Sequence, residues 1–388
     1  MKILQICPKP PRPQVDGGCI AMDAMSSGLE KNGHDVRIIA MCTEKHPAPK
    51  NSADKYKHIR ISTALNPFSA LNHLILNKSY NLARFFNEDV EREITNELRS
   101  CEYDLVILES LYATPYLGAI RCTSKAKVVL RSHNLEHEIW NGLSAKNWGL
   151  KKWYLRVLAK QLETAEREVV TGVDAVISIT VEDGSWFKEA GARKVHVMPF
   201  GLDFNKLKSV GEVDHVFHFG SMDWAPNVEG VRWLLKEVWP KVLEMKADAQ
   251  LVLAGRNMPE EFKTNSERNI AVIGEVESAE EFFKRNGVAL VPILSGSGMR
   301  IKAVEALGRG LPIIGTSLGL CGLGLKDGVN AQIADSAEGF AQKILLYLNS
   351  NELAVKQASL GAKHIRSIFD NNIIIKELEL FLNNYIAS

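Results

Sequence analysis

The sequence predicts an α/β protein made of two domains, each a parallel β-sheet with helices packed on it. Short continuous apolar runs, such as residues 288–293 and 311–314, are typical of strands buried on both faces. Helical patterns separate these runs, and the alternation of strand and helix begins twice, at residue 2 and again at residue 215. A chain of 388 residues also exceeds one ordinary core and suits two domains of about 150 to 200 residues.

The first half opens as a strand, a helix and a second strand. Residues 2–7 form the first apolar run, and a proline-rich loop leads to Asp16, which is placed to cap a helix that ends near Asn32. Residues 43–102 carry no chemistry that the pattern identifies, although a strand at 58–62 and helices between 68 and 99 are expected. The remaining strands are expected at 35–41, 104–109, 127–132, 175–179 and 194–198, and a helix capped by Thr180 at 182–190.

The second half repeats the alternation after a polar run at 205–214, which predicts a first domain of residues 1–204 and a second of 205–370. Its strands are expected at 215–219, 250–254, 270–273, 288–293 and 311–314. Its helices are expected at 228–245, 279–285, 336–349 and 352–369, with a last helix at 373–386. A further helix is expected after Gly296-Ser297-Gly298, stopped by Gly308, Gly310 and Pro312.

Composition limits the function classes. The net charge of +1 gives no global field that favours nucleic acid, so we expect no nucleic-acid partner. The six cysteines show no Cys-x-x-Cys pair or zinc-like spacing and are expected to be reduced, buried thiols. No apolar stretch approaches the length of a membrane span, and no signal peptide is apparent, so we expect a cytoplasmic protein.

A glycine loop carries the densest chemistry. Gly296-Ser297-Gly298 follows a buried strand and precedes a helix, which is where anionic ligands bind in parallel sheets. Arg300 and Lys302 then fall in the first helical turn, where a cation opposes the helix dipole unless an anion is bound nearby. These residues predict a phosphate site.

Glu305 follows Lys302 by three residues, and two interpretations of it remain open. The first is a solvated surface ion pair. The second has Arg300 and Lys302 holding a diphosphate while the Glu305 carboxylate accepts two hydroxyls of a ribose or sugar diol.

The segment G-S-G-M-R-I-K-A-V-E-A-L-G-R-G-L-P-I-I-G-T, followed by D-G-V-N-A, resembles the donor-binding region of retaining glycosyltransferases of group 1, family 4. The resemblance implies the GT-B fold, with two Rossmann-like domains facing a cleft and residues 371–388 returning to the first domain. It implies that Glu305 contacts the nucleotide ribose and acts in catalysis. The residues implied to bind the donor diphosphate or nucleotide are Gly17, Gly18, Ser221, Gly296, Ser297, Gly298, Arg300, Lys302 and Glu305.

The sequence departs from the family pattern at two of these positions. Ser297 stands where a second Glu usually contacts the sugar, and Ser221 stands where the family often carries a phosphate-binding Arg. Arg300 and Lys302 could supply the missing positive charge from the neighbouring loop.

His133 ends the strand at 127–132 and is expected at the same sheet edge as Gly17. From the residues alone, a structural hydrogen bond is the commoner role for such a His. His133 and His137 with Glu136 could also imitate a metal face, but H-N-L-E-H is not H-E-x-x-H, and no metal is expected. The resemblance implies that His133 lies beside the reacting carbon of the transferred sugar.

The resemblance implies a hexosyltransferase-type enzyme that moves a sugar from a nucleotide diphosphate sugar to a saccharide or lipid-linked saccharide acceptor. Surface polysaccharide or glycolipid assembly is the implied process. No cofactor is expected, and the reaction is expected to be metal-independent because no Asp-x-Asp occurs. Two alternatives remain: a nucleotide-sugar 2-epimerase, and a catalytically degenerate sugar-nucleotide-binding protein.

Residues 146–160 combine five Lys and Arg residues with two Trp and one Tyr. One interpretation is an interfacial helix that gives the enzyme a peripheral contact with anionic lipid on the inner face of the cell membrane. The other is a core helix with a solvated basic face, which the helical spacing of Leu155, Leu158 and Leu162 supports.

Overall fold

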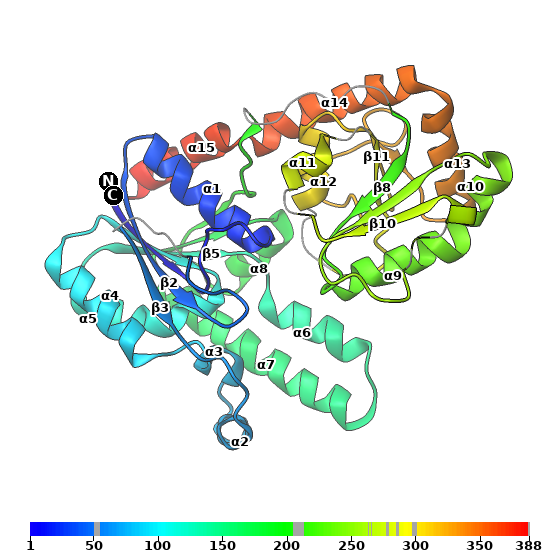
Figure 1. Ribbon diagram of the computed structural model, residues 1–388. Helices are drawn as coiled ribbons and strands as arrows, with labels where there is room; N and C mark the ends of the chain where they lie inside the picture. Colours follow the sequence, from blue (N-terminus) through cyan, green and yellow to red (C-terminus); the bar gives the residue numbers. More distant parts are fainter. Residues whose placement is uncertain are drawn as a thin grey trace. The chain divides into compact units, whose positions relative to one another are not determined.

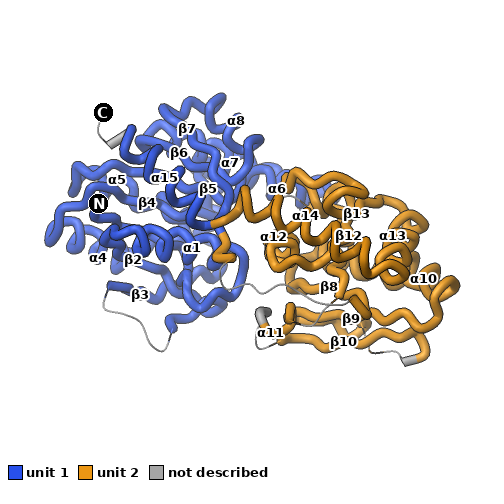
Figure 2. The backbone as a smooth tube through the Cα atoms, turned by 90° about the horizontal axis from the view of Figure 1, so that it is seen from above, with its two compact units in different colours: residues 1–201, 371–388 blue, residues 202–370 orange. Residues whose placement is uncertain are grey.

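Figure 1 shows the computed structural model of the chain. The structure describes residues 1–49, 55–204, 213–262, 264, 266–276, 279–284, 287–296 and 301–386, without the side chains of 266, 279, 280, 385 and 386. Ser297, Gly298 and Arg300 of the predicted phosphate site therefore lie outside the described residues. The described part divides into two compact units, coloured separately in Figure 2: unit 1 is Met1–Gly201 with Asn371–Ser388, and unit 2 is Leu202–Asp370.

Unit 1 is built on a parallel sheet of seven strands in the order β3-β2-β1-β4-β5-β6-β7. The strands are β1 (Lys2–Cys7), β2 (Asp35–Cys42), β3 (Tyr56–Arg60), β4 (Leu105–Glu109), β5 (Lys127–Ser132), β6 (Ala175–Ser178) and β7 (Val195–Val197). Its helices are α1 (Gly17–Lys31), α2 (Pro67–Ile75), α3 (Tyr80–Ala83), α4 (Glu88–Ser100), the 3-10 helix η1 (Leu111–Tyr116), α5 (Leu117–Thr123), α6 (Glu136–Ala145), α7 (Gly149–Gly172), α8 (Val181–Glu189) and α15 (Asn371–Ile386).

Both faces of this sheet are buried, as the continuous apolar strands predict. Alternate side chains of the central strands pack against α4, α5, α7 and α8 on one face and against α1 and α15 on the other. Helices α1 and α15 lie side by side (Figure 1), and a Cβ at Gly28 of α1 would lie 2.4 Å from Ile375 of α15. The C-terminal helix therefore completes the core of unit 1.

Unit 2 is built on a second parallel sheet in the order β10-β9-β8-β11-β12-β13. The strands are β8 (Val216–Phe219), β9 (Leu251–Ala254), β10 (Ile270–Gly274), β11 (Val288–Val291), β12 (Ile313–Gly315) and β13 (Gln332–Ile333). The helices are α9 (Ala225–Trp233), the π-helical turn η3 (Leu234–Val238), α10 (Trp239–Met245), the 3-10 helix η4 (Ser266–Arg268), α11 (Ala279–Phe283), α12 (Ile301–Gly308), α13 (Ala337–Asn349) and α14 (Asn351–Phe369). The chain is thus α/β with two parallel sheets.

Three details differ from the sequence-based expectations. Residues 146–160 are not one helix, because α6 ends at Ala145 and α7 begins at Gly149, whose φ of 61° places it in the left-handed region. Cys122 and Cys321 are exposed and Cys101 is only partly buried, so the expectation that all the cysteines are buried was wrong for these three. The boundary between the two units lies between Gly201 and Leu202, three residues before the expected boundary.

Candidate functional site

In unit 1, the predicted site residue His133 lies directly after β5, at the carboxyl edge of the sheet. Its Nε2 lies 2.7 Å from the Glu109 carboxylate at the end of the neighbouring strand β4. The His133 side chain is 13% exposed, whereas Glu109 is fully buried. The imidazole therefore has one nitrogen fixed by a buried acid.

Glu109 is held as a charged group despite its burial. Burial raises the pKa of this carboxyl, but Arg131 and the hydrogen bonds from His133 and Gln5 together lower it below the ordinary value. The Arg131 guanidinium is 3.3 Å from both carboxylate oxygens, and Gln5 Nε2 donates at 2.7 Å. Because an ionised carboxylate only accepts hydrogen bonds, His133 must carry a proton on Nε2. In the neutral ring, Nδ1 is then an acceptor.

The same polar cluster fixes helix α1. Arg131 Nη1 donates to the Ala21 carbonyl at 3.0 Å, and Gln5 Nε2 lies 3.3 Å from the Met22 carbonyl. Both carbonyls belong to the helix that begins at Gly17. Glu109 and its partners thus link the start of α1 to the strand that ends at His133, all within unit 1.

Gly17 and Gly18 begin α1, and Asp16 is its N-cap, accepting from the Cys19 amide at 2.9 Å. Lys9 Nζ contacts the Asp16 carboxylate at 2.6 Å and would lie 3.0 Å from a Cβ at Gly18. Burial raises the pKa of Asp16, but Lys9 outweighs it and lowers that pKa well below the usual range. Because residue 18 has no side chain, there is room beside it for the ammonium group of Lys9.

His46 Nε2 also contacts Asp16, at 3.0 Å. Asp16, Cys19 and His46 form the one group of three possible metal donors in close proximity that the described residues contain. Lys9 already neutralises this aspartate, and burial raises the pKa of the Cys19 thiol to about 11. Because a metal needs the thiolate and an unpaired carboxylate, these residues fit an ion-pair network better than a metal site.

His133 and His137 do not share a metal face. His137 Nδ1 contacts Glu166 of α7 at 2.5 Å, while His133 contacts Glu109. The neighbouring Glu136 accepts from the Tyr112 hydroxyl at 2.8 Å, and burial raises its pKa to about 7. A protonatable carboxyl thus lies three residues after His133.

In unit 2, the predicted residue Ser221 follows β8, and its hydroxyl donates to Asp223 at 3.0 Å. Asn227 Nδ2 donates to the Ser221 carbonyl at 2.8 Å. A Cβ at Gly255 would lie 1.7 Å from the Gly220 carbonyl, so the loops after β8 and β9 meet backbone to backbone. Ser221 therefore stabilises the conformation of this loop, because both its carbonyl and its hydroxyl have hydrogen-bond partners within the loop and α9.

Gly296 follows β11 and has a φ of 97°. A Cβ there would lie 3.0 Å from Pro226 and 3.1 Å from Trp224, which belong to the loop and helix after β8. The glycine permits both the turn and the close approach. This residue lies at the carboxyl edge of the sheet, as predicted.

Glu305 in α12 is not a solvated surface residue, because its side chain is only 13% exposed. Lys302 Nζ donates to one carboxylate oxygen at 3.0 Å, and Arg309 Nη2 contacts the other at 3.4 Å. Lys302 Nζ also lies 4.9 Å from the ring centroid of Phe219, and the Arg309 guanidinium lies 5.2 Å from that of Phe283. Glu305 is thus held between two cations over an aromatic cluster.

Sequence reasoning missed Glu109, Lys9 and Arg309, and it considered Glu136 only as part of a possible metal face. Glu109 looked like the last residue of an apolar strand, and Arg309 stood between two glycines that suggested a loop. A buried charge needs a partner, so a carboxylate ending one strand and an arginine inside the next was the available signal. No such signal marked Lys9, whose neighbours come from other elements.

The comparisons with known proteins agree with this architecture. A family described as "Glycosyltransferase Family 4" matches residues 15–206, and one described as "Glycosyl transferases group 1" matches residues 214–350. The two matches together span most of the chain and correspond to the two structural units.

Individual relatives are distant. An "uncharacterized 44.6 kDa protein in cps region" of Klebsiella pneumoniae is 24% identical, over 97% of this chain and 98% of the relative. A phosphatidyl-myo-inositol mannosyltransferase of Mycobacterium leprae is 23% identical, over 50% of this chain and 54% of the relative. Alr3699/HepE of Anabaena, solved with UDP, has a TM-score of 0.68 and 13% identity, covering 99% of this chain and 100% of that one. The protein therefore belongs to the group-1, family-4 glycosyltransferases and is an enzyme with the GT-B fold.

Proposed function

We propose that this enzyme transfers a hexose, with retention of configuration, from a nucleoside diphosphate sugar to an acceptor hydroxyl. The acceptor is a saccharide or lipid-linked saccharide of a surface polysaccharide or glycolipid. The observation that carries the proposal is Glu305, a carboxylate held by Lys302 and Arg309 in the middle of α12, the helix that follows the glycine loop.

The donor site is proposed in unit 2. Lys302, together with Arg300, Gly296, Ser297, Gly298 and the loop at Ser221, is proposed to bind the diphosphate, and Glu305 to accept hydroxyls of the ribose. Lys302 now donates to Glu305, so a bound diphosphate would compete for the ammonium and free one carboxylate oxygen for a hydroxyl. The solved UDP complex of Alr3699/HepE supports a nucleoside diphosphate as the ligand.

His133, Gly17 and Gly18 are proposed to contact the transferred sugar or its phosphates. His133 offers an Nδ1 acceptor for a sugar hydroxyl, because Glu109 fixes its Nε2 proton. Lys9, against Gly18, adds a cation that a developing negative charge on the leaving phosphate would attract. The carboxylate-held metal of other transferases is replaced in this proposal by cations and amides.

The biological setting is proposed from the relatives. The cps-region relative supports a role in surface polysaccharide, and the mannosyltransferase of phosphatidyl-myo-inositol supports a lipid-linked acceptor. We also propose a cytoplasmic location, peripheral on the inner face of the membrane, with contact through residues 146–160. Among the described helices, none has the length and hydropathy needed to cross a bilayer.

A donor panel tests the proposal. The purified protein is incubated with UDP-, GDP- and ADP-hexoses, with and without a lipid-linked saccharide, and the products are analysed by NMR. We expect slow donor hydrolysis without acceptor and a glycoside of unchanged anomeric configuration with it. Free epimerised sugar nucleotide without acceptor would point to the 2-epimerase instead, and nucleotide binding with no turnover would point to a binding protein.

A further inference from the structure

Helix α2 (Pro67–Ile75) has no buried residue, although its sequence is apolar. Phe68, Leu71 and Ile75 fall on one helical face and are all exposed, Phe68 to 85%. Leu65 and Leu76, on either side of the helix, are exposed as well. A nine-residue helix gains little stability by itself in water, so an apolar face left open suggests a surface that it contacts.

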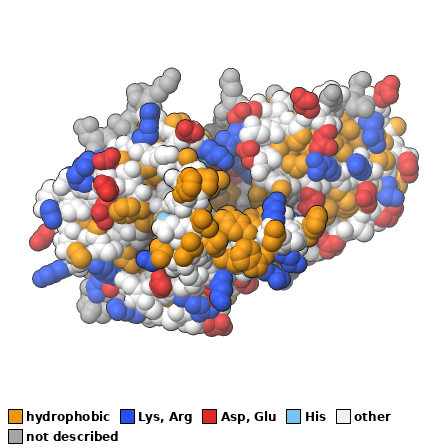
Figure 3. All heavy atoms as spheres, turned by 90° about the horizontal axis from the view of Figure 1, so that it is seen from below, with side chains coloured by type: hydrophobic (Ala, Val, Ile, Leu, Met, Phe, Trp, Pro, Cys, Tyr) orange, Lys and Arg blue, Asp and Glu red, His pale blue; other side chains and the backbone are white. Residues whose placement is uncertain are grey.

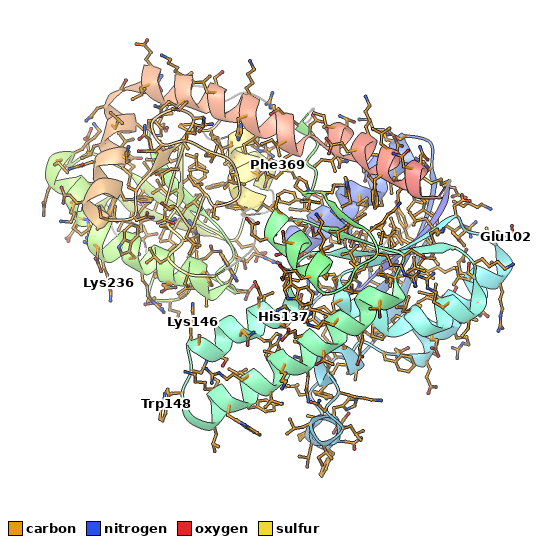
Figure 4. All side chains as sticks on the ribbon, turned by 180° about the vertical axis from the view of Figure 1, so that it is seen from behind. Glu102, His137, Lys146, Trp148, Lys236 and Phe369 are labelled. Atoms are coloured by element: carbon orange, nitrogen blue, oxygen red, sulfur yellow. The ribbon has the colours of Figure 1, made fainter. Side chains whose placement is uncertain are left out.

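The turn between α6 and α7 presents a second set of exposed apolar side chains. Trp148 is 88% and Leu150 86% exposed, and Leu143, Trp153 and Tyr154 are exposed beside them. Figure 4 shows Trp148 and Lys146 at the tip of the α6–α7 hairpin, remote from His137 at its base. These side chains therefore lie outside the core of unit 1.

The two sets belong to one face of unit 1. Gln161 of α7 donates through Nε2 to the His73 carbonyl of α2 at 3.5 Å. The His73 ring also packs on Tyr80, which begins α3. Figure 3 shows the hydrophobic side chains gathered over this face, with Lys and Arg around them. We call α2 with its flanks and the α6–α7 tip, residues 65–76 and 143–156, the apolar platform.

The two stretches of chain that form the platform carry charges of a single sign. Residues 61–87 and 139–162 contain no Asp or Glu, although the chain as a whole has 46 acidic residues in 388. The cations of these two stretches are Lys78, Arg84, Lys146, Lys151, Lys152, Arg156 and Lys160. A net charge of +1 for the whole chain means that this positive charge is local and balanced elsewhere.

We propose that the apolar platform docks the enzyme on a bilayer that contains anionic lipids. Trp side chains at the tip match the headgroup region, and the cations that surround them match anionic phosphates. A second copy of the chain fits the platform less well, because a symmetric dimer through this face would bring the two basic surfaces together.

This inference extends the membrane contact proposed for residues 146–160 and assigns α2 an equal part in it. Only the purpose of this docking rests on the proposed function: docking would keep the active site beside a lipid-linked acceptor. Docking needs neither a donor nor turnover, so it can be measured when no sugar is present.

The test is sedimentation of the purified full-length protein with vesicles. One set contains phosphatidylcholine alone and the other phosphatidylcholine with phosphatidylglycerol. We expect binding to the anionic vesicles that weakens as NaCl is raised, since salt screens the attraction to the headgroups. Binding to the neutral vesicles should be at least roughly tenfold weaker.

Variants at each part of the platform have matched controls. Phe68→Ser with Ile75→Ser, and separately Trp148→Ser with Leu150→Ser, should each reduce binding to anionic vesicles by at least roughly tenfold. Leu380→Ser, at a residue of α15 that is 64% exposed, should leave binding unchanged. Lys151→Glu with Arg156→Glu should abolish the preference for anionic lipid, whereas Lys356→Glu with Lys363→Glu in α14 should not.

Three results would overturn the proposal. The first is equal binding to neutral and anionic vesicles, and the second is loss of binding with the control variants as well. The third is no vesicle binding together with self-association of the parent that the platform variants abolish, which would make this face an interface between copies. Thermal unfolding of each variant excludes misfolding as the cause of lost binding, and failure of the donor panel would leave the vesicle result standing.

Discussion

At the scale of single residues, charge placement distinguishes a ligand site from a structural ion pair. Glu305 contacts Lys302 on one side and Arg309 on the other, and only Arg309 is buried, with an exposed fraction of 5%. The Glu305–Arg309 pair is therefore expected to be structural, whereas Lys302, at 38% exposure, is free to turn to a ligand. Glu305 would then support the fold and bind the ribose.

Titration calorimetry separates the diphosphate role from the ribose role. We expect Arg300→Ala or Lys302→Ala to weaken binding of a nucleoside diphosphate by roughly ten- to a hundredfold, because a charge-assisted hydrogen bond of about 1.5 to 3 kcal/mol is lost. The same changes should hardly affect the matching nucleoside, whereas Glu305→Gln should weaken both ligands. If Arg300→Ala binds the diphosphate as tightly as the parent, the first-turn cations form only a solvated surface.

Substitutions of His133 and Glu109 should have different effects on turnover and on stability. His133→Ala should reduce turnover far more than nucleoside diphosphate affinity, because the imidazole is expected to position the transferred sugar. Glu109→Gln should in addition lower the free energy of unfolding by about 3 to 5 kcal/mol, since it leaves the buried Arg131 without its carboxylate. Steady-state kinetics and urea unfolding of both variants check this. Equal losses of turnover and affinity in His133→Ala would indicate a structural residue.

Glu136 should make stability depend on pH. Its pKa is raised from 4.5 to about 7 in the folded chain, so between these values the folded state keeps a proton that the unfolded state has lost. The free energy of unfolding therefore falls as pH rises through this window, by about 3 kcal/mol in total. His137, whose pKa is raised by Glu166 despite its burial, acts in the same direction, because its stabilising charge is lost as pH rises through its folded pKa.

The variant Glu136→Gln should remove most of this dependence. A neutral amide keeps a partner for the Tyr112 hydroxyl and cannot ionise. Urea unfolding at pH 5 and pH 8 should show similar stability for parent and variant at the acid end and a more stable variant at the basic end. A parent whose stability does not fall between these pH values would rule out the buried, protonated Glu136.

At the scale of elements, the strands were predictable and the polar contacts at their ends were not. Continuous apolar runs marked the strands of both sheets except the short β13, which was not expected. Thr180 caps α8 as expected, accepting from the Asp183 amide at 3.1 Å. By contrast, the pairing of Glu109 with Arg131 and His133 depends on strand order, because β4 and β5 align only in the folded sheet. The exposure of the apolar face of α2 could not be predicted from the sequence either, because an apolar helical stripe normally indicates a buried face.

Gly230 shows how a helix is fixed to its sheet. In α9, a Cβ at Gly230 would lie 2.0 Å from the Pro292 carbonyl after β11, and backbone cannot move aside as a side chain can. We expect Gly230→Ala to destabilise unit 2 by more than about 2 kcal/mol, although alanine is normally the better helix former. Gly142→Ala in α6, where a Cβ meets nothing within 4 Å, should instead stabilise by about 0.5 to 1 kcal/mol. Thermal unfolding of the two variants tests this prediction. A stabilising Gly230→Ala would mean that α9 does not pack this closely against the Pro292 carbonyl.

At the scale of the whole molecule, the chain leaves unit 1 at Gly201 and returns at Asn371. The sequence predicted this return only through the resemblance, because the amphipathic pattern of the last helix does not say which domain it covers. In the structure Ile374, Ile375, Leu378 and Leu382 are all buried against α1 and the sheet of unit 1. Helix α15, at the end of the chain, therefore stabilises α1 and the first strands of unit 1.

Two leucines of α15 test this long-range dependence. Leu378 is fully buried and Leu380 is 64% exposed, on the same helix. Leu378→Ala should lower the free energy of unfolding of unit 1 by about 2 to 5 kcal/mol through lost burial and a cavity, while Leu380→Ala should change it by less than about 0.5 kcal/mol. Hydrogen exchange measured by mass spectrometry should show faster exchange in β1, β2 and α1 of the Leu378→Ala variant. Because β8 and β9 belong to the other unit, their amides should keep the protection of the parent, and equal loss of protection in both units would show that the two sheets unfold as one.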